Sequence, residues 1–272
     1  MEDGNIIEVR DLKFTYDDGT TALEHIDFNV RCGDFVALIG QNGCGKTTLS
    51  KCLNGILKRT SGSIEINGIN VNEKGVIKKL VRNIGYVFQN PDHQLFNSKV
   101  YEEIAYALHN IGLDDNEIDE RVRHAAQIAG VSKEIFDEQP CMLVKGLRQR
   151  VAIASILSLR PKIIIVDEPT TGQDYRQSVE IMQFLCKLNE EGHTIIIITH
   201  EMDIVAQYAK RILVMKKGEI YMDGTPKEVF SQPDRLMEGY VKPPLVTRLA
   251  QLLHSDGRCN DVLNIDELKA AL

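Results

Sequence analysis

The stretch Gly40-Gln41-Asn42-Gly43-Cys44-Gly45-Lys46-Thr47-Thr48 matches the pattern G-x-x-x-x-G-K-[ST] and follows an apolar run at 35–39. Its glycines allow the backbone to wrap so that several N–H groups face one phosphate. Lys46 supplies a positive charge for the β- and γ-phosphates, and the Thr47 hydroxyl suits a magnesium ion. A helix that begins here directs the positive end of its dipole toward the anion. The stretch predicts a nucleoside triphosphate site, and a chance match in a glycine-rich turn is the weaker interpretation.

A second motif supplies two adjacent carboxylates. Residues 163–168 read IIIVDE, so four apolar residues with high β-propensity end in Asp167 and Glu168. The acids would lie at the carboxyl end of a buried strand, where ligands bind in open α/β sheets. Asp167 is expected to hold magnesium through water, and Glu168 is expected to polarise the attacking water. A strand that ends in Asp-Glu is common by itself, but together with a phosphate loop it predicts a catalytic site.

Two kinds of β pattern indicate an α/β fold. The runs 35–39, 163–166 and 195–199 are continuously apolar, as in parallel strands covered by helices on both faces. The first 30 residues and 63–67 alternate more, which favours an antiparallel sheet. Apolar residues recur at helical spacing between 100 and 130, so a helical block interrupts the strand series.

The predicted fold class is α/β: a P-loop NTPase core with an antiparallel β subdomain, an inserted α-helical subdomain and a small C-terminal helical extension. We expect a nucleotide-binding domain over 1–232, with its helical subdomain at roughly 90–160, and the extension over 233–272. Thr225-Pro226-Lys227-Glu228 reads as a helix start, with Thr225 as the N-cap and Glu228 at N3.

Composition excludes several classes of protein. The net charge of -7 argues against a nucleic-acid binder, because binding to the phosphate backbone needs an excess of Lys and Arg. The six cysteines form no C-x-x-C pair, so free thiols are expected rather than a metal site or disulfides. The N-terminal MEDGNIIEVR lacks a signal-peptide core, and no apolar run approaches the length of a membrane helix. The chain is expected not to cross a membrane.

The two motifs, in this order, resemble those of the ATP-binding-cassette (ABC) ATPases over roughly 5–232. The resemblance implies that ATP and Mg²⁺ bind here, with Tyr16 stacked on adenine. It implies that Gln89, which closes a strand at 85–88, senses the γ-phosphate and contacts the metal, and that His200 contacts the γ-phosphate. It also matches PTTGQD at 169–174 to the loop that crosses the dimer interface of the family.

Within the family, NPDHQLF at 90–96 is similar to the ATPases of energy-coupling-factor (ECF) importers, which take up vitamins and cobalt or nickel ions. The tail around PPLVT at 243–247 is similar to the extension that helps those ATPases pair. This resemblance implies a subunit bound peripherally at the cytoplasmic face of a prokaryotic plasma membrane, with transmembrane transporter subunits as partners. Alternatives are an ABC ATPase of DNA repair, chromosome organisation or translation, and a regulatory nucleotide-binding subunit with little turnover.

Two segments depart from the family pattern. Gln173 stands where leucine is usual, and the signature L-S-G-G-Q reads Leu143-Val144-Lys145-Gly146-Leu147. In the family this segment grips the γ-phosphate held by the partner's phosphate loop. Valine has no hydroxyl to donate, and a side chain at Lys145 crowds a backbone that must approach phosphate closely. Loss of one donor to developing charge costs about 3 kcal/mol.

The altered signature predicts a heterodimer with a second ABC ATPase, in which one site is competent and the other impaired. The alternative is a tolerated or engineered variant of the signature. A separate expectation concerns Cys44, which lies in the phosphate loop beside Lys46. A neighbouring cation and a helix N-terminus lower the pKa of a thiol, so Cys44 is expected to react with thiol reagents unless ATP protects it.

Overall fold

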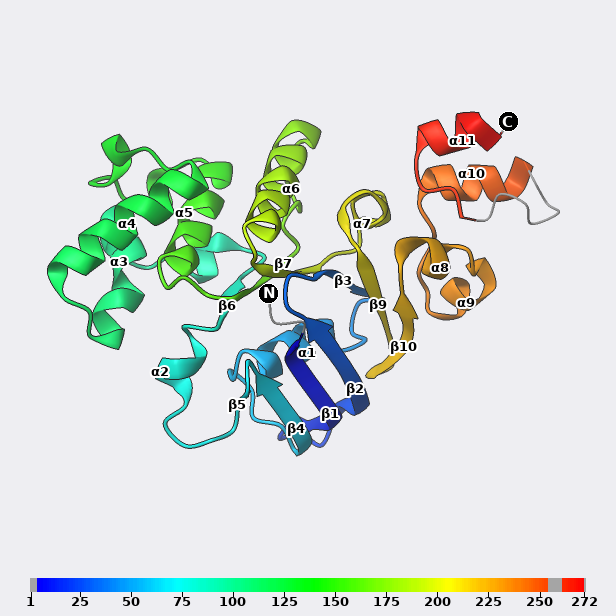
Figure 1. The fold of residues 1–272 in the computed structure, drawn as a ribbon, viewed down its shortest axis with the longest axis horizontal. Coiled ribbons are helices and arrows are strands. Elements are labelled where there is room, and N and C mark those ends of the chain that lie inside the picture. Colours follow the sequence, from blue (N-terminus) through cyan, green and yellow to red (C-terminus); the bar gives the residue numbers. More distant parts are fainter. Residues whose placement is uncertain (1–3, 254–260, 272) are drawn as a thin grey trace.

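A six-stranded sheet forms the centre of the molecule in the computed structural model, which describes residues 4–253 and 261–271 (Figure 1). Its strand order is β10-β9-β3-β8-β7-β6, and all neighbours are parallel except β9 and β10. Continuous Ile and Val runs bury both faces of the inner strands, as predicted. The predicted strands are confirmed to within one residue at each end. The strands are β3 (Phe35–Gly40), β6 (Ile84–Val87), β7 (Ile163–Asp167), β8 (Thr194–Ile198), β9 (Arg211–Lys216) and β10 (Glu219–Gly224).

The predicted antiparallel sheet is also present, below the central sheet in Figure 1. It has the order β2-β1-β4-β5, and side chains of its buried face, such as Ile7 and Ile64, pack with Val36 and Leu38 of β3. This shared core fixes the N-terminal sheet against the strand that leads into the phosphate loop. The strands are β1 (Asn5–Thr15), β2 (Thr21–Arg31), β4 (Ser61–Ile66) and β5 (Ile69–Asn70).

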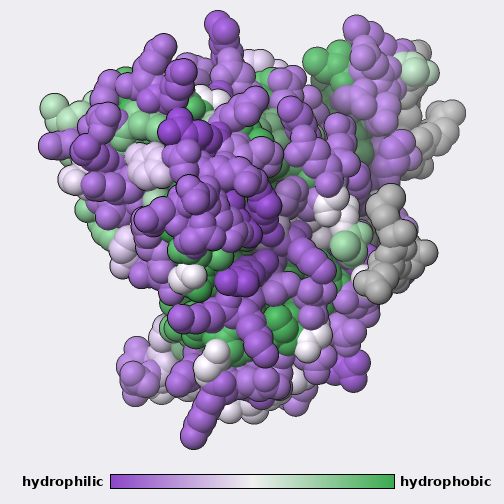
Figure 2. Space-filling model, turned by 60° about the vertical axis from the view of Figure 1, so that its left-hand side comes forward, coloured by the Kyte–Doolittle hydropathy of each residue, from purple (hydrophilic) through white to green (hydrophobic). Residues whose placement is uncertain are grey.

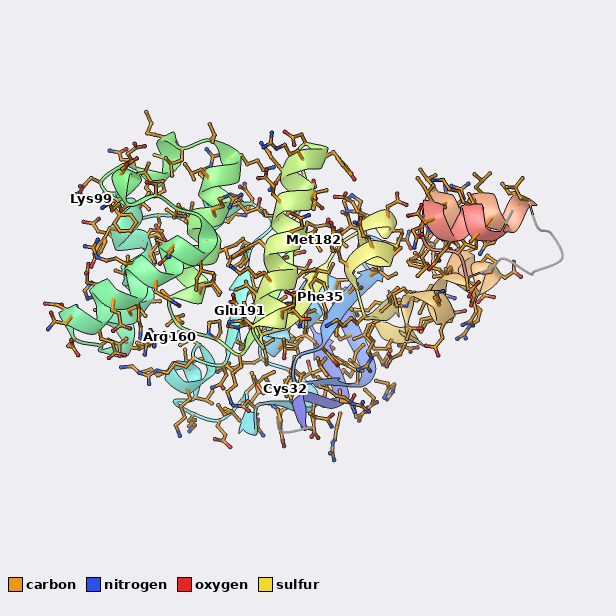
Figure 3. The ribbon with its side chains drawn as sticks, turned by 45° about the horizontal axis from the view of Figure 1, so that its top comes forward. Cys32, Phe35, Lys99, Arg160, Met182 and Glu191 are labelled. Atoms are coloured by element: carbon orange, nitrogen blue, oxygen red, sulfur yellow. The ribbon has the colours of Figure 1, made fainter. Side chains whose placement is uncertain are left out.

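A helical block is inserted in the sequence between β6 and β7, as predicted, although these two strands pair directly in the central sheet (green, Figure 1). It contains α3 (Val100–Ile111), α4 (Asp115–Ala129) and α5 (Lys145–Leu157), with short 3₁₀ turns at Pro91–His93, Lys133–Ile135 and Pro140–Met142. The other helices before the C-terminal region are α1 (Lys46–Leu53), α2 (Ile77–Leu80), α6 (Tyr175–Glu190) and α7 (Met202–Tyr208). Met182 of α6 and Phe35 of β3 belong to one core that also includes side chains of the helical block (Figure 3).

Within residues 225–253 and 261–271, four helices follow β10. They are α8 (Pro226–Phe230), α9 (Pro233–Glu238), α10 (Leu245–Leu253) and α11 (Ile265–Ala271). Thr225 and Glu228 form the predicted capping box. Phe230 and Leu236 belong to the main core, whereas Ala250 of α10 and Leu268 of α11 belong to a small separate cluster. The division at 232 and 233 stays a prediction.

The surface is mostly hydrophilic on the face drawn in Figure 2, where hydrophobic side chains gather only in limited patches. Among the described residues, no helix combines the length and the apolar composition that crossing a bilayer requires. The five cysteines within the described ranges are free thiols, as expected, and Cys259 lies outside those ranges.

Candidate functional site

A cavity of about 740 Å³ opens at the carboxyl ends of the parallel strands. It brings together most of the residues predicted from the sequence and adds residues of β2 and of the β9–β10 turn. Gly40, Gln41 and Cys44 do not line it. The lining residues are Tyr16, Thr20, Thr21, Ala22, Asn42, Gly43, Gly45, Lys46, Thr47, Thr48, Gln89, Asp167, Glu168, Ile198, His200, Lys217 and Gly218.

The phosphate loop depends on a glycine where α1 begins. Gly45 is the N-cap of α1 with a φ of 108°, and a Cβ there would lie 2.7 Å from the carbonyl oxygen of Ala22. The loop therefore turns tightly against β2 and leaves the first backbone N–H groups of α1 directed toward the cavity. Lys46 is only 8% exposed, and its Nζ donates hydrogen bonds to the carbonyl oxygens of Gly40 (2.8 Å) and Gln41 (3.0 Å). The positive charge is held inside the curve of the loop.

Tyr16 forms one side of the cavity. Its hydroxyl lies 2.8 Å from Thr48 Oγ1, and its ring makes an edge contact with Phe14 at 4.8 Å between centroids. The side chain is 40% exposed. A ring fixed at both ends and open on one side can stack against a flat ligand group.

Asp167 ends β7 and is buried beneath the cavity. Tyr86 of β6 donates its hydroxyl to Asp167 Oδ2 at 2.7 Å. Burial raises the pKa of the Asp167 carboxyl, while the Tyr86 hydrogen bond and the positive charge of Lys46 oppose that rise. Burial and the neighbouring Asp167 also raise the pKa of the Tyr86 phenol, so this hydroxyl stays a donor. A buried carboxylate that is only partly compensated favours a cation beside it.

Several hydrogen bonds hold Glu168, which follows Asp167 in the sequence. His200 Nδ1 lies 2.8 Å from Glu168 Oε1, and the Thr171 hydroxyl donates to Glu168 Oε2 at 3.2 Å. The backbone N–H of Glu168 donates to the carbonyl oxygen of Ile198. Its φ is 48°, a left-handed conformation that is strained for a residue with a side chain. The carboxylate is thus fixed at the cavity wall by the residues around it.

Gln89 follows β6 and lines the cavity next to the helical block. The loop after it is attached firmly to that block. Gln94 Nε2 donates to the carbonyl oxygen of Ala152 in α5 (2.8 Å), and the buried Glu103 of α3 accepts the backbone N–H of Phe96 (2.8 Å). A displacement of Gln89 would therefore be transmitted to α3 and α5.

Sequence reasoning missed Tyr86 and Lys217. Tyr86 occupies a buried strand position that reads as an ordinary core residue, and nothing in the sequence marks its contact with Asp167. Lys217 lies in the turn between β9 and β10 with a φ of 50°. The Lys-Gly pair at 217–218 is a turn signal, but only the packing of this turn against Cys44 brings it to the cavity.

The expectation that the surroundings of Cys44 lower the pKa of its thiol is wrong. Its side chain is 5% exposed and packs in the core shared by the two sheets, with residues such as Leu49 and Met215. Burial raises the pKa of the Cys44 thiol, and the opposing effect of Lys46 is smaller. The motif places Cys44 near a cation and a helix terminus, but it does not reveal that the thiol points away from the cavity.

The altered signature lies at the start of α5. Val144 is the N-cap of α5, has no side chain that can cap the helix, and is 74% exposed. Lys145 is the first residue of the helix, and its Nζ donates to the carbonyl oxygen of Thr171 at 2.9 Å. This segment therefore offers no hydroxyl to a phosphate at the position of Val144.

Comparison with known proteins identifies the family. The family described as ABC transporter matches residues 23–171, which is more than half of the chain. The energy-coupling factor transporter ATP-binding protein EcfA2 of Caldanaerobacter subterraneus is 41% identical over 271 residues, with 97% of this chain and 95% of the relative covered. An ATP-binding protein of the same organism, assigned to ABC transporters, is 46% identical over 91% of this chain. This chain spans 43% of that relative's length.

A solved structure agrees with these sequence relatives. The chain cbiO1 of Clostridium perfringens, described as part of the ABC transporter complex cbiONQ, is 38% identical and has a TM-score of 0.77. The match covers 95% of this chain and 99% of cbiO1. The chain belongs to the ABC transporter family and is an ATP-binding, ATP-hydrolysing member of it. Within that family it is a relative of the ATPases of energy-coupling factor transporters.

Proposed function

We propose that the cavity binds ATP with Mg²⁺ and that its hydrolysis drives an ECF-type importer. The observation that carries this proposal is the arrangement of Lys46, Asp167 and the Glu168–His200 pair around one cavity at the carboxyl ends of β3, β7 and β8. Phosphoryl transfer to water requires positive charge around the phosphates and a residue that orients the attacking water. Lys46 and Glu168 would meet these two requirements. The resemblance to ABC ATPases is a second, independent support.

The phosphate loop, residues 40–48, would cradle the phosphates, with Lys46 between the β- and γ-phosphates. Lys46 would then exchange its bonds to the loop carbonyls for bonds to phosphate oxygens. Tyr16 would stack against adenine. Thr47, Gln89 and Asp167 would hold Mg²⁺, since oxygen donors suit this ion and the buried Asp167 carboxylate favours a cation. The ion would supply positive charge that neutralises the β- and γ-phosphate oxygens.

Glu168 would orient and polarise the attacking water, and its fixed position reduces the reorganisation that the reaction needs. His200 contacts Glu168 and would reach the γ-phosphate with its other ring nitrogen. Binding of the triphosphate would then be sensed by Gln89 and passed to α3 and α5 through the contacts of Gln94 and Glu103. The switch is closure around the γ-phosphate, and hydrolysis reverses it.

We also propose that the chain acts beside a second ABC ATPase at the cytoplasmic face of a prokaryotic plasma membrane, bound to transmembrane subunits. The names of EcfA2 and of the complex that contains cbiO1 support such an assembly. The altered signature at Val144 and Lys145 favours a heterodimer, in which the partner supplies an intact signature to this chain's phosphate loop. The transported substrate would be a vitamin or a transition-metal ion, as in the importers that the chain resembles.

The test combines binding, hydrolysis and assembly. The purified chain should bind ATP in the presence of Mg²⁺, and Lys46→Ala should lower that affinity at least tenfold because a charge on the phosphates is lost. The matched control is Lys187→Met, a surface change on α6. Affinity purification from detergent-solubilised native membranes should recover a second ABC ATPase and membrane-spanning proteins. Failure of the folded chain to bind Mg-ATP would refute the proposal.

A further inference from the structure

The first residue of α5 makes an unusual contact within its own chain. Lys145 stands where the family signature has its first glycine, and a cation in the first turn of a helix is unfavourable because the helix dipole is positive there. Its Nζ is instead directed to the carbonyl oxygen of Thr171, 2.9 Å away. Thr171 belongs to the segment 169–174, which follows Glu168 in the sequence. The ammonium is thus bonded to the loop that follows the proposed catalytic carboxylate.

The loop 169–174 leaves room for the Lys145 ammonium at Gly172, which has no side chain. Gly172 has a φ of 73°, and a Cβ there would lie 2.4 Å from Lys145 Nζ. Any other residue at 172 would displace the ammonium from its position. The absence of a side chain at Gly172 and the presence of one at Lys145 are therefore complementary.

The second departure from the family pattern reinforces the same junction. Gln173 stands where leucine is usual, and its amide donates to Gln149 Oε1 in α5. Gln149 in turn donates to the carbonyl oxygen of Pro169 at 2.8 Å. The two atypical residues, Lys145 and Gln173, thus make polar bonds across one boundary between α5 and the loop 169–174.

The loop passes these contacts to the carboxylate. Thr171 donates its hydroxyl to Glu168 Oε2 (3.2 Å), and its backbone N–H donates to the carbonyl oxygen of Glu168 (3.3 Å). A continuous series of hydrogen bonds therefore runs from Lys145 through Thr171 to Glu168, whose other oxygen is bonded to His200.

We propose that Lys145 is a positioning residue that holds Glu168 of its own chain in place, rather than a phosphate ligand of the partner's site. The inference rests on the proposed function, because it assigns Lys145 an effect on the hydrolysis step at this chain's phosphate loop. An altered signature then weakens the partner's site while it stabilises the catalytic carboxylate of this chain. The two candidate roles of Lys145 can be distinguished in a pair of subunits with one active phosphate loop. If Lys145 positions Glu168, its substitution affects hydrolysis at the phosphate loop of its own chain. If Lys145 is a phosphate ligand, its substitution affects hydrolysis at the phosphate loop of the other chain.

The experiment uses mixed pairs of two differently tagged full-length copies. Lys46→Ala in the second copy disables its phosphate loop, so the remaining hydrolysis occurs at the loop of the first copy, facing the signature of the second. Lys145→Met in the first copy should lower kcat about fivefold and leave the KM for ATP unchanged, because one hydrogen bond to a positioning group is lost. Lys145→Met in the second copy should leave both unchanged.

A conservative variant and a matched control complete the kinetic series. Lys145→Arg in the first copy should restore most of kcat, and Lys187→Met should resemble the unmodified chain. A loss confined to the second copy would overturn the inference, since Lys145 would then act across the interface. Equal loss in both copies, or in neither, would also overturn it.

A measurement without hydrolysis separates this inference from the proposed function. The backbone N–H groups of Thr171 and Gln173 are hydrogen-bonded to Glu168 and Thr170. Their hydrogen exchange, measured on the whole nucleotide-free chain, should be faster in Lys145→Met and normal in Lys145→Arg. Unchanged exchange in Lys145→Met would overturn the inference, even if the chain hydrolyses ATP. A chain that binds no ATP but shows the expected exchange would instead refute the proposed function.

Discussion

The starts of α1 and α5 are two helix N-termini that each begin with a lysine bonded to carbonyl oxygens of its own chain, yet their surroundings differ. At α1, Gly45 opens the helix and Lys46 lies buried inside the loop, beside a cavity with two carboxylates. At α5, Val144 is exposed without a hydroxyl, and Lys145 is bonded to its own chain. In the proposed pair of subunits, one site would need both helix starts, from different chains. Under that proposal, this chain keeps a complete half around α1, while its other half, at the start of α5, has diverged.

The largest expected effect tests the complete half of the site, which is the phosphate loop with Asp167 and Glu168. Glu168→Gln should lower kcat about a thousandfold because the amide cannot accept a proton from water. ATP affinity should be retained or increased, since the substitution removes a negative charge near the γ-phosphate. Steady-state hydrolysis and equilibrium nucleotide binding measure the two effects. A variant that keeps a tenth of the rate would show that another group activates the water.

The second effect tests the altered half. Val144→Ser should raise hydrolysis by pairs of this chain at least tenfold, because a donor aimed at developing charge contributes up to about 3 kcal/mol. The serine would also cap α5 and stabilise the chain by about 1 kcal/mol. Val144→Ala is the matched control, since it shortens the side chain without adding a hydroxyl. Equal rates in all three proteins would mean that the departure at Val144 is tolerated, and the argument for a heterodimer would lose its basis.

The sequence predicted α1 and its surroundings better than it predicted the contacts of α5. Continuous Ile and Val runs identify parallel strands, and the order of strands places Asp167, Glu168 and His200 at the edge that holds the phosphate loop. The departures at Lys145 and Gln173 are visible in the sequence, but their bonds to 169–174 are not, because they join segments that only the packing of α5 brings together.

Side-chain direction is the other property that the motifs do not contain. Cys44 lies in the phosphate loop, yet its thiol points into the core rather than the cavity. Tyr86 has the sequence context of an ordinary strand residue, yet its hydroxyl binds Asp167. Neither contact follows from the spacing of the motifs. The direction of a loop side chain, or the partner of a hydroxyl on a strand, depends on residues that are distant in the sequence and packed against it.

A third effect compares a cysteine from each region. Cys44 is buried with a raised pKa, whereas Cys141 is exposed two residues before Leu143. A maleimide at pH 7.5 should modify Cys141 at least tenfold faster than Cys44, because it needs an accessible thiolate. ATP should slow the modification of Cys141 by pairing the subunits over the signature and should leave the exposed Cys32 unchanged. Peptide mass spectrometry measures the rates, and faster modification of Cys44 would contradict the buried position of its thiol.

The smallest effect concerns the hydrogen bond from Tyr86 to Asp167, which lies beneath the complete half of the site. Burial raises the pKa of the Asp167 carboxyl above its ordinary value of 3.8, and the Tyr86 hydrogen bond opposes this rise. The folded chain therefore takes up this proton at a higher pH than the unfolded chain does. The ionised carboxylate thus disfavours folding at neutral pH, and this cost disappears as the pH falls through the raised pKa. Activity follows the opposite course, since the protonated acid cannot hold a metal ion.

Tyr86→Phe removes the only opposing hydrogen bond found for Asp167 in the described part of the chain, so protonation should occur at a still higher pH. At limiting Mg²⁺ the variant should lose about threefold in rate on the acidic side of the pH profile and almost nothing near pH 8.5, as expected for one hydrogen bond of modest net contribution. Phe88→Leu is a control, because it disturbs the aromatic pair with Tyr86 but keeps the hydroxyl. An equal loss at both pH values would indicate that Tyr86 only packs against Asp167. A loss that is restored by excess Mg²⁺ would place the effect of Tyr86 on the metal-binding carboxylate, beneath the complete half of the site.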